Sequence, residues 1–569
     1  MKSTRMLKTR VFVLSSSICL LLFTAWCAGE SAHQSTPSQA SQKAIEAWQD
    51  LRFGMFIHWG PVALTGHEIG WSRGRETPIE EYDSLYKRFN PVKFNAEEWV
   101  AVAKAAGMKY MVLTTKHHDG FCLWDTRQTN YNIMNTPFGR DVVKELAAAC
   151  KKGGIRFGTY YSTCDWHHPD FPLTSPGGKT VRATSDLDAY TNYLQAQSRE
   201  LLTNYGPLLT LWYDVPQKFD SSRGQGVINM VRAIQPDIVI NNRTGARGDY
   251  DTPEQRIGGF QIDRPWETCM TICRQWAWKP NDSMKSLEQC LHTLIRTNGG
   301  DGNLLFNVGP MPSGEMEARQ VDRLKEMGRW LAKNGEAIYA TRGGPWTPCA
   351  DIVSTRKHNK IYLHLLTKNE GPITLSALPV AIQSAQLLNG PAIRAETKEG
   401  LLTLDFTDNA WDAIDTIVEI TITGSALDIA PIHPFAHKFA PIIKATASHT
   451  ISRQYAASHA IDGNSGTRWA TPAGTRACWI QLDLDKETTL SSIMINEAYA
   501  HPKSRVLKFE LQKRDGDSWT TFHHGTGLGE YFKTDFVPVT TQAIRLNVLD
   551  AGEGPTITEI QIPLHTPTP

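Results

Sequence analysis

The stretch Leu208-Leu209-Thr210-Leu211-Trp212-Tyr213-Asp214-Val215-Pro216 decides the fold. A short apolar run ends in two aromatic residues, an acid and a proline. This pattern is typical of a buried parallel strand that places a carboxylate at the carboxyl-terminal edge of a sheet. We therefore interpret Asp214 as a catalytic nucleophile. Other residues with reactive or hydrogen-bonding side chains follow similar runs elsewhere in the chain: His58, His117, His118, Tyr160, Tyr161 and Arg243.

Strands and helices alternate on both sides of this stretch. Residues 110–115 and 155–161 read as strands, and amphipathic segments at 96–106, 141–152 and 187–205 read as helices. Such alternation favours βαβ units and a parallel sheet. Because the polar residues follow strand ends, and those ends converge on one mouth in a barrel, we predict a (β/α)8-like barrel over residues 42–345.

The pattern changes after the barrel. Short alternating segments separated by turns predict a small antiparallel β-sandwich over residues 346–427. A proline-containing linker at 428–440 and a second strand-rich region at 441–563 follow. The fold class is therefore a multidomain chain in which two β modules come after the barrel.

Charge and the N-terminus limit the possible partners and compartment. Lys and Arg number 59 and Asp and Glu number 58, with no basic stripe, so nothing in the sequence points to nucleic acid. Residues 1–29 read as a signal peptide, since basic residues precede an apolar core too short and too Ser-rich to span a membrane. We predict a periplasmic or secreted protein without a membrane-spanning segment. Cys27 leaves a lipid anchor as the alternative.

Two carboxylates suit hydrolysis of a glycosidic bond, in which one attacks the anomeric carbon and the other protonates the leaving oxygen. Asp214 is the first. Glu254 follows one βα unit later, so it can come from the next loop of the same mouth, and we predict it as the acid/base. Glu267 is the alternative acid/base, with an inner-wall position as its other interpretation.

The histidines favour hydrogen bonding over metal binding. His117 and His118 are adjacent at a strand end, and adjacent strand residues point to opposite faces. Neutral imidazoles can donate to or accept from hydroxyl groups, as can His58. Arg243 adds a fixed fork of donors near Asp214, with a salt bridge to a barrel carboxylate as its other interpretation.

These residues lie in motifs that resemble glycoside hydrolase family 29, the α-L-fucosidases. The matching motifs lie between residues 46 and 345 and are Phe53–Gly60, Thr115–Phe121, Tyr160–Ser162, Leu211–Asp214, Trp266–Glu267 and Gly302–Pro310. The resemblance implies a retaining mechanism with Asp214 as the nucleophile, Glu254 as the acid/base and no catalytic cofactor. It also implies that the residues contacting fucose are His58, His117, His118, Tyr161, Trp212 and Arg243, with Trp276 packed on the sugar's methyl group.

One motif departs from the family. Many members carry Glu and Trp side by side after the first strand, whereas Glu68 and Trp71 are separated here by two residues. Both are therefore candidate sugar contacts, and which of them touches fucose stays open.

The C-terminal region resembles the discoidin or F5/8 type C fold of carbohydrate-binding family 32. The matching segments are Ala460–Asn464, Thr467–Trp469, Trp479–Leu484 and Ile557–Ile560. The resemblance implies a possible structural Ca²⁺, for which hard oxygen ligands are available from Asp462, Asn464, Thr467 and Glu559.

The resemblance to family 29 thus implies an exo-acting, retaining α-L-fucosidase acting on fucosylated oligosaccharides or glycoconjugates. Retaining chemistry requires the two carboxyl groups to lie about 5–5.5 Å apart. A glycan-binding protein with a degenerate barrel is the alternative from the binding class, and a metal-dependent hydrolase built on the histidines is a third.

Overall fold

The structure is a computed structural model that describes residues 39–173, 182, 184–349, 351–368, 371–406, 411–435, 439–463, 467–498, 504–529 and 532–564. The predicted signal peptide lies outside these residues. None of the helices in the described part of the chain combines the length and the apolar character needed to cross a bilayer.

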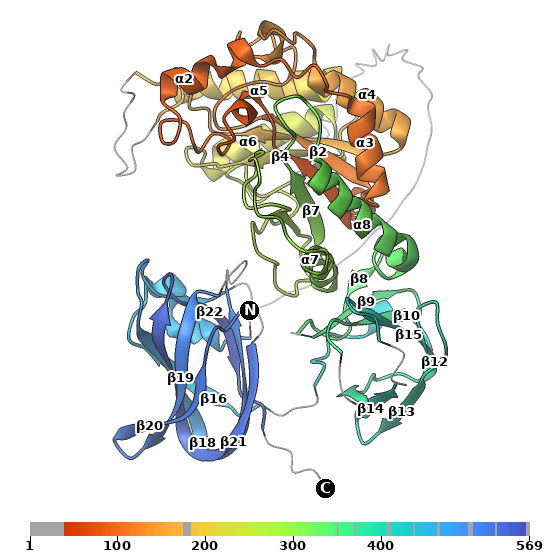
Figure 1. The fold of residues 1–569 in the computed structure, drawn as a ribbon, viewed down its shortest axis with the longest axis vertical. Helices are drawn as coiled ribbons and strands as arrows, with labels where there is room; N and C mark the ends of the chain where they lie inside the picture. Colours follow the sequence, from red (N-terminus) through yellow and green to blue (C-terminus); the bar gives the residue numbers. More distant parts are fainter. Residues whose placement is uncertain are drawn as a thin grey trace, which may run out of the picture. The chain divides into compact units, whose positions relative to one another are not determined.

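The first part is a curled sheet of seven parallel strands in the order β5-β4-β3-β2-β1-β7-β6. Figure 1 labels β2, β4 and β7 of this sheet. Its strands are β1 (Phe53–Ile57), β2 (Tyr110–Lys116), β3 (Arg156–Ser162), β4 (Thr210–Asp214), β5 (Val239–Ile240), β6 (Glu267–Thr271) and β7 (Asn303–Val308). Parallel pairing and the apolar strands agree with the predicted barrel class. The described sheet differs from the predicted eight-stranded barrel: it has seven strands, β5 has only two residues, and β5 and β6 are its two edges rather than neighbours, so it is a curled half-barrel.

An irregular segment lies between the two edges of this sheet. Parallel bridges join Asn241 to Tyr250, Asp251 to Trp266, and Glu254 to Cys269. Residues 250–254 therefore run between the end of β5 and β6 without forming a regular strand. This placement brings Glu254 to the same sheet edge as Asp214.

The helices of this part lie before, between and after the strands of the sheet: α1 (Gln42–Gln49), α2 (Ile79–Ser84), α3 (Ala96–Ala105), α4 (Val142–Gly153), α5 (Leu187–Asn204), α6 (Ser221–Ile234), α7 (Leu287–Gly299) and α8 (Ala318–Asn334). Side-chain oxygens cap several first turns, as Asp141 does by accepting from the Lys144 amide. Gly154 ends α4 in the left-handed region at φ 73°, which a glycine adopts without a Cβ penalty.

Side chains of the strands alternate between two apolar cores. Leu211 and Tyr213 belong to the core between the sheet and the helices, whereas Trp212 belongs to a second core inside the curl. The inner core also contains Tyr160 and Phe56. Only side chains on the inner face of the sheet can therefore line a pocket inside the curl.

The second part consists of two antiparallel sheets. One has the order β12-β15-β10-β9-β8 and the other the order β11-β14-β13. The strands are β8 (Arg342–Gly343), β9 (Ile352–Lys357), β10 (Lys360–Leu365), β11 (Ile373–Ser376), β12 (Ile382–Leu387), β13 (Arg394–Lys398), β14 (Leu401–Asp405) and β15 (Thr416–Ile422). Both sheets contribute to one core, which includes Leu363, Leu375 and Leu402.

The third part is an antiparallel β-sandwich module with its own core. Its strands are β16 (Ile442–Ala447), β17 (Trp469–Ala470), β18 (Cys478–Glu497), β19 (Val506–Asp515), β20 (Ser518–Gly525), β21 (Phe532–Ala551) and β22 (Thr556–Gln561). Trp469 lies fully buried in that core beside Ile480 and Ile557.

Candidate active site

A pocket opens where the parallel strands end. Its walls come from β1, β3, β4 and β6 and from the segments that follow β1, β2, β4, β5 and β6. The residues that line it are Phe56, His58, Trp71, His117, His118, Tyr160, Trp212, Asp214, Val215, Arg243, Glu254, Cys269 and Trp276. Apart from Glu68, Tyr161 and Glu267, every predicted site residue of the barrel is in this set.

Asp214 ends β4 inside the pocket and is only 8% exposed. Its Oδ2 accepts a 2.8 Å hydrogen bond from the Tyr160 hydroxyl, and its Oδ1 accepts from Arg243 Nη1 at 2.8 Å. Burial by itself would raise the pKa of Asp214, but Arg243, His118 and the Tyr160 hydrogen bond together hold that pKa below its usual value. The side chain is therefore an ionised carboxylate at neutral pH.

Arg243 links the two predicted catalytic carboxylates. The same Nη1 donates to Asp214 Oδ1 and to Glu254 Oε2, each at 2.8 Å. The two oxygens are therefore at most twice that distance apart, 5.6 Å. Retaining glycosidases hold their carboxyl groups about 5–5.5 Å apart, and inverting enzymes about 6.5–9.5 Å. The contact that both carboxylates make with Arg243 therefore favours the shorter separation, that of retaining enzymes.

Asp214 and Glu254 differ in exposure. The side chain of Asp214 is 12% exposed, whereas that of Glu254 is 41% exposed. Arg243 is fixed independently by Thr252, whose hydroxyl accepts from Nε and whose carbonyl accepts from Nη2. The pocket thus has a buried acid at its wall and an accessible acid at its rim.

His58 presents an acceptor to the pocket. Asn307 donates its amide group to the Trp276 carbonyl, so its Oδ1 faces His58 Nδ1 at 2.6 Å and accepts from it. Burial lowers the pKa of His58 to about 3, so the ring is neutral and Nε2 carries the lone pair. This tautomer follows from the hydrogen-bond network.

His117 and His118 both line the pocket, with ring centroids 4.0 Å apart. The expectation that they point to opposite faces was wrong, because β2 ends at Lys116 and the strand alternation ends with it. His118 Nδ1 contacts the Ser162 hydroxyl at 2.6 Å, and its Nε2 lies 3.8 Å from Asp214 Oδ2. Burial lowers the pKa of His118 to about 4.

Tyr160 rather than Tyr161 lies in the pocket. Tyr160 is paired with Trp212 across β3 and β4, and both point inside the curl. Tyr161 points to the opposite side, where its hydroxyl donates to Gln197 of α5 at 2.7 Å. The prediction that Tyr161 lies in the site is therefore wrong, and Tyr160 is the tyrosine that lines the pocket. The alternation from Trp212 and Asp214, which share one face, is the sequence signal that could have identified it.

Glu68 and Trp71 take different positions. The Glu68 carboxylate accepts from the backbone amides of Trp276 and Ala277 at 2.9 and 3.0 Å, and it does not line the pocket. Trp71 lines the pocket, is 39% exposed and packs edge-on against His118 and Trp166. Trp71 is thus the pocket-facing residue of the two, while Glu68 fixes the loop that carries Trp276.

Glu267 occupies the inner wall behind the pocket. It is 1% exposed, and its carboxylate accepts from Trp212 Nε1 at 3.0 Å and from the Tyr110 hydroxyl. It is absent from the pocket lining, so its alternative assignment as acid/base is not supported by its position.

Val215 and Cys269 were not predicted as pocket residues. Val215 has a φ of 50°, which is a strained conformation for a β-branched residue, and its amide donates back to Asp214 Oδ1 at 2.9 Å. Cys269 faces inward from β6. No sequence motif signals either position, because backbone strain and strand register appear only in the fold.

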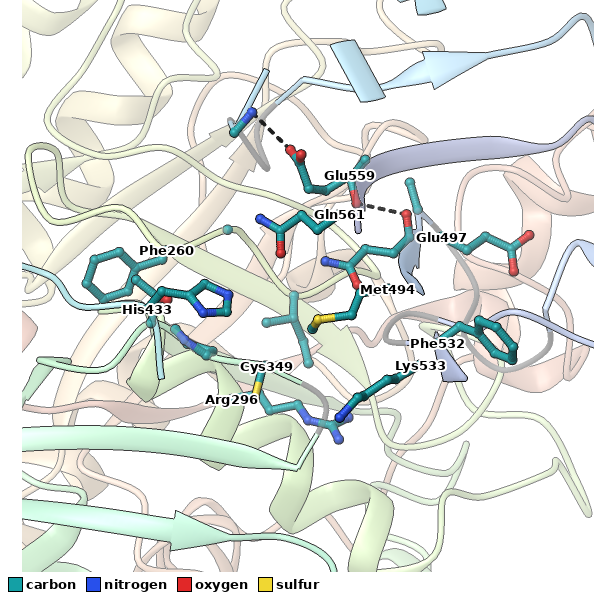
Figure 2. Close-up of a pocket in the computed structure, with 18 of the residues that line it drawn as sticks. Phe260, Arg296, Cys349, His433, Met494, Glu497, Phe532, Lys533, Glu559 and Gln561 are labelled. Atoms are coloured by element: carbon teal, nitrogen blue, oxygen red, sulfur yellow. Dashed lines mark hydrogen bonds between the residues drawn. The ribbon is translucent and has the colours of Figure 1, made fainter. Parts of the chain in front are cut away.

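The predicted calcium ligands of the C-terminal module are partly described. The Thr467 hydroxyl contacts both carboxylate oxygens of Asp462, at 2.9 and 2.7 Å. Glu559, labelled in Figure 2, accepts a 3.0 Å hydrogen bond at Oε2 from the Gly463 amide. Burial and the charge of Asp462 raise the pKa of Glu559 to about 8. Asn464 lies outside the described residues. These two carboxylates repel each other and offer oxygen ligands to a hard cation, whose binding would relieve the repulsion.

Two family models match the chain. The model described as "Alpha-L-fucosidase" matches residues 22–336, and the model described as "F5/8 type C domain" matches residues 444–561.

Curated relatives and solved structures agree with the first match. The chain is 32% identical to plasma alpha-L-fucosidase of Homo sapiens, over 58% of this chain and 76% of that protein. It is 30% identical to tissue alpha-L-fucosidase of Rattus norvegicus, over 68% of this chain and 89% of that protein. Among solved structures, alpha-L-fucosidase isoenzyme 1 from Paenibacillus thiaminolyticus superposes with a TM-score of 0.61 at 34% identity, covering 67% of this chain and 99% of that one.

Proposed function

The chain belongs to the alpha-L-fucosidase family of glycoside hydrolases, and from this membership we propose that it is an exo-acting, retaining α-L-fucosidase that releases terminal α-L-fucose from glycans or glycoconjugates by double displacement. The observation that carries the proposal is the pair of carboxylates, Asp214 and Glu254, bound to the same nitrogen of Arg243.

In the first step Asp214 attacks the anomeric carbon of fucose. The bond from that carbon to the leaving oxygen breaks as the bond to the Asp214 carboxylate forms, and Glu254 transfers its proton to the leaving oxygen. The lowered pKa of Asp214 supports this role, since it keeps the carboxylate ionised as a nucleophile. The accessible rim position of Glu254 supports its role, because the leaving group must depart toward solvent.

In the second step water hydrolyses the fucosyl ester. Glu254 accepts a proton from the water while the water oxygen bonds to the anomeric carbon and the ester bond to Asp214 breaks. The second inversion restores the original configuration, so fucose leaves as the α-anomer.

The remaining pocket residues suit a small deoxy sugar. His58 offers a neutral Nε2 acceptor for a sugar hydroxyl. Trp276 and Trp71 offer apolar faces for the methyl group and the C–H surfaces of the sugar.

The test uses hydrolysis of p-nitrophenyl α-L-fucoside by the wild type, Asp214→Ala and Asp263→Ala. Asp263 is exposed and lies outside the pocket lining, so it is a matched control for removing a carboxylate. We expect loss of turnover by Asp214→Ala, unchanged turnover by Asp263→Ala, and α-fucose as the first product detected by NMR. A wild type without turnover would leave the glycan-binding alternative, and β-fucose as first product would contradict retention.

Two further expectations accompany this function. We propose that the protein is exported by its N-terminal signal into the periplasm or medium, which cell fractionation and N-terminal sequencing of the mature protein can test. We also propose that the C-terminal module holds a structural Ca²⁺ through Asp462, Asn464, Thr467 and Glu559, on the basis of the repelling carboxylates of Asp462 and Glu559.

A further inference from the structure

Glu267 is a buried carboxyl group that the proposed reaction does not use. It begins β6 on the inner face of the curled sheet, in contact with two aromatic donors. Trp212 Nε1 donates to one carboxylate oxygen at 3.0 Å, and the Tyr110 hydroxyl donates to the other. Burying a carboxyl group is unfavourable unless it is hydrogen-bonded, so a purely apolar inner wall would avoid this penalty.

Trp212, the donor on the pocket side, packs against two residues that bind Asp214. The Trp212 ring stacks on Tyr160, with centroids 5.5 Å apart and planes 20° from parallel. The Arg243 guanidinium carbon lies 5.0 Å from the Trp212 ring centroid. Tyr160 and Arg243 are the two residues whose side chains donate to Asp214 at 2.8 Å. A shift or rotation of the indole would therefore move both partners of the nucleophile.

The indole needs Glu267 to keep this orientation. Trp212 is 1% exposed, and Glu267 Oε1 accepts its Nε1–H. If that acceptor were removed, the buried N–H would lose its hydrogen bond, and the ring could regain one only by moving. Tyr160 and Arg243 lie against the faces of the ring, and neither accepts its N–H.

We propose that Glu267 is a positioning residue for the reaction: through the Trp212 indole it holds Tyr160 and Arg243 in the geometry that directs Asp214 at the anomeric carbon. This role rests on the proposed function, because it concerns the same nucleophile. It differs from the acid/base role, since Glu267 acts through Trp212 and does not touch the substrate.

The first experiment compares Glu267→Leu, Glu267→Gln and Tyr110→Phe by kcat, KM and thermal unfolding. The Leu side chain leaves the indole N–H of Trp212 without its acceptor. Gln keeps an oxygen acceptor for it while its amide donates to Tyr110. Tyr110→Phe removes the other partner of Glu267 and leaves the Trp212 bond intact, so it is the matched control. The substrates are p-nitrophenyl α-L-fucoside and α-L-fucosyl fluoride, which has no bulky leaving group.

We expect Glu267→Leu to lower kcat on the order of 10- to 100-fold on both substrates, as small displacements of reacting groups do. Its KM should stay close to the wild-type value, whereas Glu267→Gln and Tyr110→Phe should retain most of the wild-type kcat. A merely structural role would instead reduce the unfolding temperature of Glu267→Leu and Tyr110→Phe alike, and leave kcat per folded molecule unchanged. That result would overturn the inference.

Trp212→Phe tests the same contact from the other side and does not depend on the folding of Glu267→Leu. It removes the indole N–H while Glu267 stays in place, so we expect a comparable loss of kcat, and a wild-type kcat would overturn the proposal. In the double variant with Glu267→Leu, the losses should not multiply, because both changes break one contact. Inactivity of the wild type on both fucosides would refute the proposed function itself, which is a distinct outcome.

Discussion

Tyr160 and Tyr161 are neighbours in sequence, and their side chains point to opposite sides of β3. The Tyr160 hydroxyl donates to Asp214, and the Tyr161 hydroxyl donates to Gln197 in the outer core. Removing each hydroxyl therefore has a different consequence, although the two substitutions are chemically the same.

We expect Tyr160→Phe to lower kcat by about 10- to 100-fold, since a hydrogen bond to a charged group contributes about 1.5–3 kcal/mol. Tyr161→Phe should leave kcat unchanged and lower the free energy of unfolding by about 1 kcal/mol. Steady-state kinetics and denaturant unfolding of both variants make the comparison. Equal losses of kcat would contradict the assignment of Tyr160 to the pocket.

The proposed role of Glu254 as the acid can be tested by comparing substrates with different leaving groups. Glu254→Ala removes the proposed proton donor, so kcat/KM for a methyl fucoside should fall by about 10²- to 10⁴-fold. Hydrolysis of α-L-fucosyl fluoride should fall far less, because fluoride departs without protonation by a carboxylic acid. A similar loss on both substrates would assign Glu254 a role other than that of the acid.

Glu267 makes stability depend on pH. Burial raises its pKa to about 7 in the folded chain, above the value of about 4.3 expected in the unfolded chain. The folded state therefore binds the proton more tightly. The stabilisation present below pH 4.3 is lost as pH rises toward 7, by up to about 4 kcal/mol at 1.36 kcal/mol per pKa unit.

Glu267→Gln removes this titration. We expect the stability of the wild type relative to Glu267→Gln to decrease from pH 5 to pH 8, as measured by thermal unfolding of both proteins at each pH. The comparison cancels other titrating groups, such as Asp119, whose pKa burial raises to about 6. Parallel pH profiles for the two proteins would show that Glu267 ionises normally.

At the scale of elements, the sequence predicted the strands and most helices because their apolar periodicity and caps are local. The helix over 141–152 is found as α4, and the strand before Asp214 is found as β4. The irregular segment 250–254 was foreseen only as a loop carrying Glu254, because isolated bridges leave no periodic pattern.

Some site residues could likewise be predicted from local sequence patterns, and others could not. Residues at strand ends, such as Asp214 and His58, could be predicted because a parallel sheet brings those ends together. The choice between Tyr160 and Tyr161, and between Glu68 and Trp71, depended on which face or loop direction each side chain takes. Those directions come from tertiary packing and not from residue type.

Two glycines within helices offer a matched test of packing between elements. A Cβ added at Gly328 of α8 would lie 1.7 Å from the Ala105 carbonyl oxygen of α3, whereas at Gly226 of α6 it would meet no atom within 4 Å. Gly328→Ala should lower the free energy of unfolding by about 1–3 kcal/mol or more, through overpacking. Gly226→Ala should raise it by about 1 kcal/mol, through helix propensity. Denaturant unfolding measures both, and stabilisation by Gly328→Ala would contradict the close contact of α3 and α8.

At the scale of the whole molecule, the catalytic region and the C-terminal module have separate apolar cores. Family models match each of these regions over separate residue ranges. A change confined to the module should therefore leave the chemistry at Asp214 intact.

The proposed Ca²⁺ tests this separation. Added Ca²⁺ should raise the unfolding temperature of the module in chelator-treated protein, and Asp462→Ala should abolish that shift while kcat on p-nitrophenyl α-L-fucoside stays at the wild-type value. The stabilisation follows from binding to the folded state alone. Isothermal titration and differential scanning calorimetry supply the readouts, and a wild type that binds no Ca²⁺ would rule out the site.

Arg243 gives the two acids a common counter-ion, and this sets up an alternation during turnover. When Asp214 becomes an ester it loses its negative charge, so of the two acids joined by the shared Nη1 only Glu254 can still be ionised. The guanidinium contact that the two acids share is then left to Glu254 alone, and it is divided again once the ester is hydrolysed.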